Sequence, residues 1–438
     1  MMRKLQHYHR AFKEVAQLQG TGVAVRRTVH FLRSRIMARL RMRTDKGPPR
    51  PARLEDQFTS DIAARIAGAV QSLPPAPVTR DFVLILSDIQ IRQCVHYRIL
   101  QKIRYLSKIG IRAQHAHPEE LGRIRSLLPF AHAVIVYRTA LAQPLLDELR
   151  ATGARLVFEF DDLIVGSDAV RQSGILREIP QRMGENLMAL ADRLLQTARL
   201  CDGLIVSTDY LGRIYGKPGS ALADKPIHVL PNFLEEDCTA RPPGLAEYTF
   251  AYTTPSGSIT TELQMLSAFL RAYDQIAERP WSLVTMGNHL AATELGKIDF
   301  RQGNIVAIPF EEYDIYLGHI SRAQAVLIPL ARTGFNSAKT PIRVMDAALA
   351  GTQAIFSPVG AYAPIGEGMG ANLLAVEDED WAGAGRYGAT TLEMRSHNIA
   401  HLRAAVNALY GPESAAATYR RVFVQGLGIL ATQAEARA

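Results

Sequence analysis

Short apolar runs separated by amphipathic segments recur along the chain from residue 82 onward. The first run, Phe82–Leu86, contains no polar side chain, which is typical of a strand buried on both faces of a parallel sheet. The segment after it has apolar residues at helical spacing and ends at Gly110. Further apolar runs lie at 134–137, 156–158, 204–206 and 227–230, with a long helical segment at 178–200. Alternating strands and helices predict a parallel α/β sheet with right-handed crossovers.

The same alternation restarts after a loop at 233–247. A strand is predicted at 248–253 and a helix at 260–278, and further strands are predicted at 283–287, 305–308, 325–330 and 354–356. Helices predicted at 390–410 and 413–435 close the chain. The pattern therefore predicts an α/β protein with two tandem Rossmann-like, doubly wound domains, 78–245 and 246–412, and a closing C-terminal helix at 413–438.

The segment before the first domain, residues 1–77, is distinguished by its charge. Residues 1–50 hold thirteen Lys and Arg side chains and two acidic ones, a balance of +11, so the rest of a chain with net charge +8 carries −3. Apolar residues give an imperfect helical stripe through 22–43, and a linker rich in helix breakers follows at 46–54. We therefore expect residues 1–77 to be a basic helical extension and linker.

The basic extension has more than one possible partner. We expect residues 1–45 to dock on an anionic membrane surface, because basic side chains beside an apolar stripe are the composition of an interfacial helix. A solvated or partner-binding helical arm is the alternative, and nucleic-acid binding by the arm is a weaker one. The nearly neutral body is not expected to bind nucleic acid.

Length and composition limit the class of protein. A chain of 438 residues is too long for one ordinary domain, and its 47% hydrophobic and 21% charged residues are those of a globular protein. No apolar run approaches the roughly 20 residues that span a bilayer, and the N-terminus lacks the pattern of a signal peptide. The three cysteines, Cys94, Cys201 and Cys238, fit neither a disulfide framework nor a zinc site. We expect a cytoplasmic protein, peripheral at the inner face of the membrane if residues 1–45 dock there.

The most informative stretch is 335–351, which follows one predicted strand and precedes another. Thr340 is predicted to cap a short helix, with Pro341 at its first position and Gly351 just past its end. The helix N-terminus then lies at the carboxyl edge of a parallel sheet, where its dipole and free N–H groups favour a phosphate. Lys339 would add a positive charge there, and Asp346 could accept hydrogen bonds from sugar hydroxyls. The alternative is an ordinary helix of a doubly wound domain, with Arg343 and Asp346 as a surface ion pair.

This stretch resembles the donor-binding segment of GT-B glycosyltransferases, in particular the retaining enzymes called glycosyltransferase group 1 or family 4. In a subgroup the pattern is F-N-x-x-K-[ST]-x-x-K-x-x-E-x-x-x-x-G, followed by a strand ending in Ser and then by Tyr. The matching residues are Phe335, Asn336, Lys339, Thr340, Arg343, Asp346, Gly351, Ser357 and Tyr362. Arg343 replaces the second Lys and Asp346 the Glu, while Ala338 stands where the broader family has the first Glu of its E-x7-E pair.

The resemblance covers roughly residues 80–430 and implies a nucleotide-sugar site in the second domain. The residues it assigns to the donor are Ser256, Gly257, Ser258, Asn336, Ser337, Lys339, Thr340, Arg343 and Asp346. The first three open the second domain's first predicted helix, where Gly lets a ligand approach the backbone and the helix N-terminus favours an anion. An ordinary strand–helix turn remains the alternative for them.

In the first domain, two groups of residues are candidates for the cleft between the domains. His96, Tyr97 and Arg98 lie early in the first predicted helix, and we expect His96 and Arg98, together with Lys339, to be catalytic. Tyr97, Arg138, Asp161 and Asp162 are expected to line the acceptor side. The run from Glu159 to Asp162 would also suit a metal, since hard cations prefer oxygen ligands, or a helix cap. We expect no metal, because the resembled enzymes use basic residues and helix dipoles instead.

Together these observations predict a metal-independent, hexosyltransferase-like enzyme that moves a sugar from a nucleotide-sugar to a glycan or lipid-linked acceptor. The resemblance further implies retention of configuration and bacterial-type polysaccharide or glycoconjugate synthesis. No cofactor is expected, because the nucleotide-sugar is a co-substrate. Two rival interpretations remain: a catalytically inactive subunit that binds nucleotide-sugars or glycans, and a GT-B-shaped nucleotide-sugar epimerase.

Overall fold

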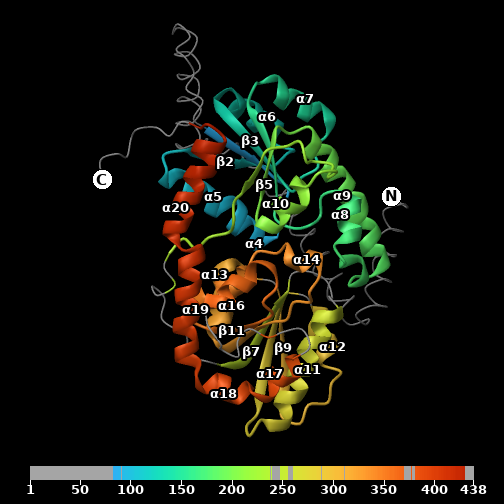
Figure 1. Ribbon diagram of the computed structural model, residues 1–438, viewed down its shortest axis with the longest axis vertical. Coiled ribbons are helices and arrows are strands. Elements are labelled where there is room, and N and C mark those ends of the chain that lie inside the picture. The colour runs from blue at the N-terminus through green and yellow to red at the C-terminus, as the bar shows by residue number, and fades with distance from the viewer. Residues whose placement is uncertain are drawn as a thin grey trace, which may run out of the picture. The chain divides into compact units, whose positions relative to one another are not determined.

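The computed structural model describes residues 82–89, 91–236, 238, 247–254, 260–287, 289–309, 311–368, 376 and 380–429. The basic extension at 1–77 and the predicted turn at Ser256, Gly257 and Ser258 lie outside these residues. Residues 79–438 form one compact unit, which holds both predicted domains (Figure 1). Across the described ranges, no helix combines the length and the apolar character needed to cross a membrane.

The first domain is built on a six-stranded parallel sheet with the order β2-β1-β3-β4-β5-β6. Its strands are β1 (Phe82–Leu86), β2 (Arg112–Ala116), β3 (Ala131–Tyr137), β4 (Arg155–Phe160), β5 (Gly203–Val206) and β6 (Ile227–Val229). The helical segments between them are α4 (Arg92–Cys94), η1 (Val95–Leu100), α5 (Gln101–Lys108), α6 (Leu121–Leu127), η2 (Leu128–Phe130), α7 (Gln143–Ala151), α8 (Ser167–Gln172), η3 (Ile175–Arg177), α9 (Gln181–Arg199) and α10 (Asp209–Gly216).

The second domain is built on a five-stranded parallel sheet with the order β11-β10-β7-β8-β9. Its strands are β7 (Tyr248–Thr254), β8 (Trp281–Gly287), β9 (Gly303–Ile308), β10 (Ala323–Ile328) and β11 (Gln353–Phe356). Its helical segments are α11 (Thr260–Ile276), α12 (His289–Leu295), α13 (Tyr313–Ser321), α14 (Gly334–Ser337), α15 (Ile342–Ala350), η5 (Gly360–Tyr362), α16 (Ala363–Gly368), α17 (Trp381–Arg386), α18 (Gly388–Glu393) and α19 (Arg395–Tyr410).

Helices cover both faces of the first sheet, because successive strand residues point to opposite sides. Leu84 and its neighbours on one face pack against α7, α9 and α10. Val83 and Ile85 on the other face pack against α5 and against the C-terminal segments α20 (Pro412–Tyr419) and η6 (Arg420–Gly426). The sheet is therefore buried on both faces, as its uninterrupted apolar strands predict.

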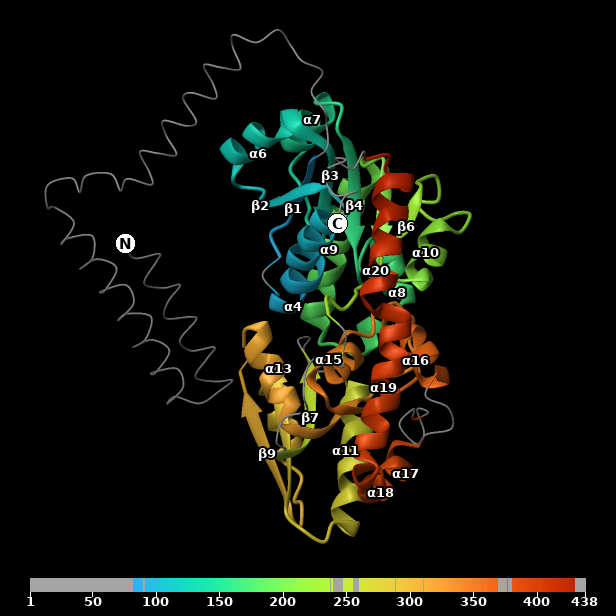
Figure 2. The ribbon, with the colours of Figure 1, turned by 90° about the vertical axis from the view of Figure 1, so that its left-hand side faces the viewer.

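The last helices connect the two domains. Helix α19 packs on α15 and α16 of the second domain, and α20 packs on α5 of the first. Gly411, between the two helices, has an extended backbone. Figure 2 shows α19 and α20 running one after the other along both domains. The predicted closing segment thus packs on the first domain as α20 and η6.

The predicted fold class is confirmed, with one strand that the sequence did not indicate. Strand β2, Arg-Ala-Gln-His-Ala, lies at the edge of the first sheet and alternates between exposed and less exposed residues. An edge strand needs no continuous apolar run, because only part of its surface is covered.

Candidate functional site

The strand order reverses once in each sheet, between β1 and β3 in the first and between β7 and β10 in the second. Ligands of doubly wound proteins bind outside the carboxyl ends of the strands at such points. A cavity of about 160 Å³ lies there and is lined by residues of both domains. Its lining residues are Ile91, Gln93, Cys94, Asp161, Asp162, Thr253, Tyr316, Phe335, Lys339, Thr340, Ile342, Arg343 and Tyr362.

The segment that follows β10 lies directly against the first domain. The backbone N–H of Phe335 donates to the carbonyl of Ser173 at 2.9 Å. The Thr208 hydroxyl donates to the carbonyl of Ala338 at 3.2 Å. Phe335 and Ala338 belong to the same apolar cluster as the first sheet. The loop that carries Lys339 is therefore held by contacts with both domains.

Helix α15 begins one residue later than the sequence predicted. Pro341 is its N-cap, with no side-chain capping bond, and the Pro341 carbonyl accepts from Val344 N–H at 3.0 Å. The prediction that Thr340 caps this helix is wrong, because its hydroxyl accepts a hydrogen bond from the Asn232 side chain of the first domain at 3.0 Å. Gly351 ends the helix with φ of 69°, as predicted. The helix N-terminus opens on the cavity, where unsatisfied N–H groups favour an anion.

Two cations lie beside this helix terminus. Lys339 Nζ lies 3.7 Å from one carboxylate oxygen of Glu262, and Arg343 Nη1 lies 3.9 Å from the other. Arg343 also donates to the carbonyl of Thr253 at 3.2 Å. Burial lowers the pKa of the Lys339 ammonium, and the Glu262 carboxylate opposes that shift. These groups form the basic side of the cavity.

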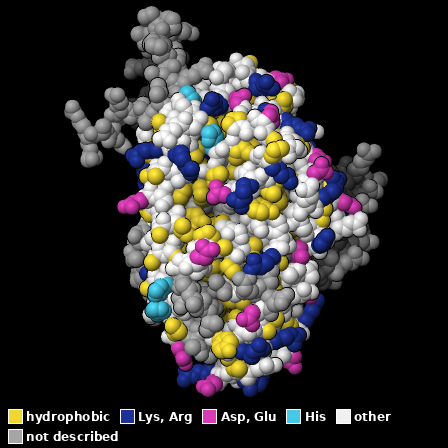
Figure 3. Space-filling view, in the orientation of Figure 1, with side chains coloured by type: hydrophobic (Ala, Val, Ile, Leu, Met, Phe, Trp, Pro, Cys, Tyr) yellow, Lys and Arg dark blue, Asp and Glu magenta, His cyan; other side chains and the backbone are white. Residues whose placement is uncertain are grey.

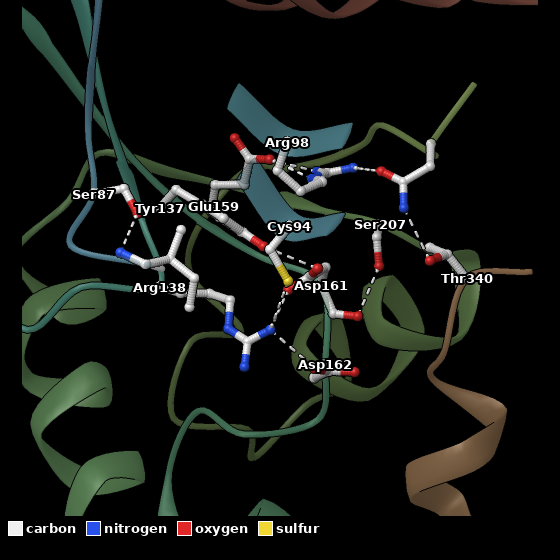
Figure 4. A network of polar contacts seen from close by, with 12 residues as sticks. Ser87, Cys94, Arg98, Tyr137, Arg138, Glu159, Asp161, Asp162, Ser207 and Thr340 are labelled. Carbon is white, nitrogen blue, oxygen red and sulfur yellow. Dashed lines mark hydrogen bonds and ion pairs between the residues drawn. The ribbon is translucent and has the colours of Figure 1, made fainter. Parts of the chain in front are cut away.

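Acidic groups from the first domain also line this cavity, and Figure 4 shows Asp161 and Asp162 beside Arg138. Arg138 Nη1 donates to Asp161 Oδ1 and to Asp162 Oδ2, each at 3.0 Å. Asp161 also accepts from the Tyr137 hydroxyl at 3.0 Å. Burial raises the pKa of the Asp162 carboxyl, while Arg138 opposes the change. Asp161 and Asp162 therefore line the small cavity, and their expected role on the acceptor side stays a prediction.

Arg138 has a strained backbone. Its φ of 51° is the one positive value at a residue other than glycine in the described part of the chain. Left-handed backbone at a residue with a Cβ is held only where its surroundings fix it, and such residues cluster at functional sites. Here the conformation is fixed by the N–H of Arg138, which donates to the Glu159 carbonyl at 2.9 Å, and by its two aspartate partners.

Arg98 does not reach the cavity. Its side chain is buried, and it donates to Glu159 Oε1 at 2.7 Å, to the Leu230 carbonyl at 2.8 Å and to Asn232 Oδ1 at 3.0 Å. Lys102 pairs with the other oxygen of Glu159. The expected catalytic role of Arg98 is therefore corrected. Arg98 is a buried structural residue that holds Leu230 and Asn232, where the chain leaves the first domain. Glu159 points away from Asp161 and Asp162, so these three acids do not meet at one place.

Asp346 is fully buried under tyrosine hydroxyls. Tyr97 donates to its Oδ1 at 2.5 Å, Tyr313 to the same oxygen at 2.7 Å, and Tyr316 to Oδ2 at 3.1 Å. Burial raises the pKa of this carboxyl to about 6, and the three hydroxyls oppose the shift. The alternative of a surface ion pair with Arg343 is wrong. Because Asp346 is fully buried, a ribose could contact it only after the side chains around it had moved.

Three other predicted residues lie near the site without lining the small cavity. His96 stacks on Tyr313 with ring centroids 3.7 Å apart, and both line a separate cavity of about 750 Å³. Asn336 donates to the Ala331 carbonyl at 3.0 Å, and Ser337 donates to the Thr333 carbonyl at 2.9 Å. Asn336 and Ser337 therefore shape the loop that presents Lys339, and any direct donor contact of theirs stays a prediction.

Sequence reasoning missed Glu262. It lies in the first turn of α11, where acidic residues are common because they offset the helix dipole, so its position carried no distinguishing signal. It also missed the link made by Glu178 of the first domain, which accepts from the N–H of Thr261 at 2.9 Å and from its hydroxyl at 2.8 Å. Only the folded chain brings these residues together.

Comparison with models of known protein families finds no match, and comparison with curated proteins finds none either. Solved structures do match. A sucrose-phosphate synthase from Thermosynechococcus elongatus has 14% sequence identity and a TM-score of 0.55, over 80% of this chain and 100% of that one. A glycosyltransferase from Rickettsia africae has 11% identity and a TM-score of 0.51, over 79% and 98%.

A third similar structure is an alpha-glucosyltransferase in complex with UDP-glucose and DNA containing an abasic site. It has 9% identity and a TM-score of 0.52, over 77% of this chain and 98% of that one. At these identities the likeness establishes the fold. The chain has the GT-B fold, and the resemblance to GT-B glycosyltransferases is confirmed.

Proposed function

We propose that this protein transfers a sugar from a nucleotide-sugar to a hydroxyl group of an acceptor. The observation that carries the proposal is the pairing of Lys339 and Arg343 with the N-terminus of α15, at the strand-order reversal of a GT-B fold. Positive charge and free N–H groups suit the diphosphate of the donor. The aspartates across the cavity suit the hydroxyl groups of a sugar or an acceptor.

In this reaction the bond between the anomeric carbon and the diphosphate oxygen breaks, and the acceptor oxygen forms a new bond to that carbon. The nucleoside diphosphate leaves with the bonding electrons, and its phosphate oxygens take up the proton that the acceptor hydroxyl loses, directly or through solvent. Lys339 and Arg343 would stabilise the charge that develops on the leaving oxygen, which is the largest contribution the site offers. Closure of the cleft around the donor would exclude water and so favour transfer over hydrolysis.

The finer features of the proposal rest on the family resemblance. They are a hexosyl donor, retention of configuration, catalysis without a metal, and a glycan or lipid-linked acceptor in bacterial-type polysaccharide synthesis. A lipid-linked acceptor would give residues 1–45 a reason to dock on the inner face of a membrane.

The expectation that the body does not bind nucleic acid stays a prediction from the charge of its sequence. On the face in Figure 3, Lys and Arg side chains are interspersed with Asp and Glu side chains over the described atoms. A nucleic-acid-binding surface instead gathers its basic residues into one patch or stripe.

The test is release of nucleoside diphosphate from a panel of nucleotide-sugars, measured with and without candidate glycan and lipid-linked acceptors. We expect release that depends on the acceptor and is abolished by Lys339→Ala. Binding without release would favour the inactive subunit, and interconversion of sugars without an acceptor would favour the epimerase. Absence of both binding and release across the panel would refute the proposal.

A further inference from the structure

We propose that Glu262 is a positioning residue of the donor site, which holds Lys339 and Arg343 side by side and turned toward the donor diphosphate. This inference rests on the proposed function and adds a residue that the sequence pattern did not contain. Glu262 belongs to α11, whereas both cations belong to the segment after β10. Glu262 therefore links the segment after β7 to the segment after β10, the two strands between which the strand order reverses.

The burial of Glu262 indicates a specific role. Its side chain is 0% exposed, and removing a carboxylate from water is costly unless nearby charges and hydrogen bonds compensate. Within the described residues, Glu262 Oε1 accepts no hydrogen bond, and its Oε2 is reached by the Tyr252 hydroxyl only at 3.5 Å. The neighbouring cations are thus its main compensation.

The separations leave the cations available to a ligand. Charge-assisted hydrogen bonds are about 2.7–2.9 Å long, whereas Lys339 and Arg343 lie 3.7 and 3.9 Å from the carboxylate oxygens. Each of the two side chains has a second contact that helps to orient it. Lys339 Nζ lies 5.0 Å from the centre of the Phe335 ring, and Arg343 donates to the Thr253 carbonyl at 3.2 Å. Glu262 therefore attracts both cations but leaves their N–H groups able to donate hydrogen bonds to a ligand.

The balance of charge fits a diphosphate. Two cations and one carboxylate leave a net positive charge on the second-domain side of the cavity. The charged groups that act on Lys339 are Glu262 of α11, Arg343 of α15 and Asp162 after β4, and Arg138 lies behind Asp162. Tyr252, Tyr316 and Tyr362 are the titratable hydroxyls around them. Without Glu262, Arg343 and burial would both favour neutral Lys339, and two like charges would repel each other.

The decisive variant is Glu262→Gln, which keeps the volume and removes the charge. The probe is inorganic pyrophosphate, and its affinity is measured by calorimetry from about pH 7 to 10. We expect affinity to fall as Lys339 loses its proton, and this fall to begin at lower pH in Glu262→Gln than in the parent. Comparing variant and parent at each pH cancels the ionisation of pyrophosphate itself. When Lys339 is also replaced by Ala, the pH profiles with Glu262 and with Glu262→Gln should coincide.

Controls separate positioning from general damage. Glu294→Gln removes an exposed acid of the same domain that pairs with Lys297, and should leave the profile unchanged. Glu262→Asp keeps the charge on a shorter side chain, so it should keep the parent midpoint and bind several-fold more weakly. If Glu262→Gln does not fold, Glu262→Asp alone decides, and parent-like affinity there would overturn the inference.

The outcomes distinguish this inference from the proposed function. If the parent binds pyrophosphate and the Glu262→Gln profile coincides with it, Glu262 is not a positioning residue and the donor site stands. If the parent binds neither pyrophosphate nor any nucleoside diphosphate, the proposed function itself fails.

Discussion

Replacing Asp346 by Asn should stabilise the protein at neutral pH. The carboxyl is fully buried, and burial raises its pKa from 3.8 to about 6 against the hydrogen bonds of Tyr97, Tyr313 and Tyr316. When the pKa of an acid is higher in the folded than in the unfolded state, the folded state binds the proton more tightly. The resulting contribution to the free energy of unfolding is fully present below the unfolded pKa and is lost as the pH rises through the folded pKa. For Asp346 the loss falls between about pH 4 and pH 6.

The size of the effect follows from the pKa. The rise from 3.8 to about 6 corresponds to ~3 kcal/mol, at about 1.4 kcal/mol for each pKa unit. Asn has nearly the shape of Asp, its carbonyl accepts from a tyrosine hydroxyl, and it does not titrate. Asp346→Asn should therefore exceed the parent in unfolding free energy at pH 7 by up to ~3 kcal/mol, with the gain shrinking toward pH 4.

The assay is urea unfolding at about pH 4.5 and pH 7, followed by tryptophan fluorescence. Both tryptophans, Trp281 and Trp381, are buried in the second domain with Asp346. A matched control with the opposite sign is Asp274→Asn. Burial raises the pKa of Asp274, but hydrogen bonds from the N–H groups of Arg301 and Gln302 and from Trp281, together with the charge of Arg301, outweigh burial and lower it. This variant should therefore lose stability at pH 7.

A result that refutes this reasoning is an Asp346→Asn protein that is less stable than the parent at pH 7, or one whose difference from the parent is the same at both pH values. If the expected gain is found, the native carboxylate lowers stability at neutral pH. Residues kept at such a cost are typical of functional sites.

Three further predictions concern binding, metals and membranes. Lys339→Ala should weaken nucleoside diphosphate binding by ~1.5–3 kcal/mol, the range for hydrogen bonds to charged groups, and calorimetry showing parent-like affinity would contradict the assignment. Turnover should persist in EDTA; complete loss that magnesium or manganese restores would instead indicate a metal at the acidic side of the cavity. Full-length protein should sediment with anionic liposomes at low salt, while a chain that begins near Pro74 should stay in the supernatant. If neither form sediments, residues 1–45 do not bind membranes.

The fold was predictable because central strands such as β1 and β5 are buried on both faces and are short apolar runs. The spacing of the apolar runs shows two α/β repeats without reference to distant contacts. Strand β2 was missed for the complementary reason: at the sheet edge, residues such as Arg112 and Gln114 remain compatible with water. The strand orders of the two sheets could not be predicted, because they depend on which segments pair across the chain.

The site was predictable only where its chemistry is local in sequence. Lys339 and Arg343 follow one strand and flank one helix start, so a short pattern contains both. Arg98 was misplaced because its partner Glu159 lies 61 residues further on, and nothing near Arg98 shows that its charge is neutralised. The setting of Asp346 was equally hidden, because its tyrosines come from η1 and α13, in different domains.

The packing of α20 and η6 on the first sheet has a consequence for synthesis on the ribosome. The face that includes Val83 and Ile85 is covered in part by residues between Ala415 and Ile429, which are made only after the whole second domain. At a translation rate of ~5–20 residues per second, on the order of ten seconds or more pass before the residues that cover this sheet face are synthesised. During this interval the nascent chain presents an apolar surface that a chaperone can recognise. The domain that is translated first is thus the one that is completed last.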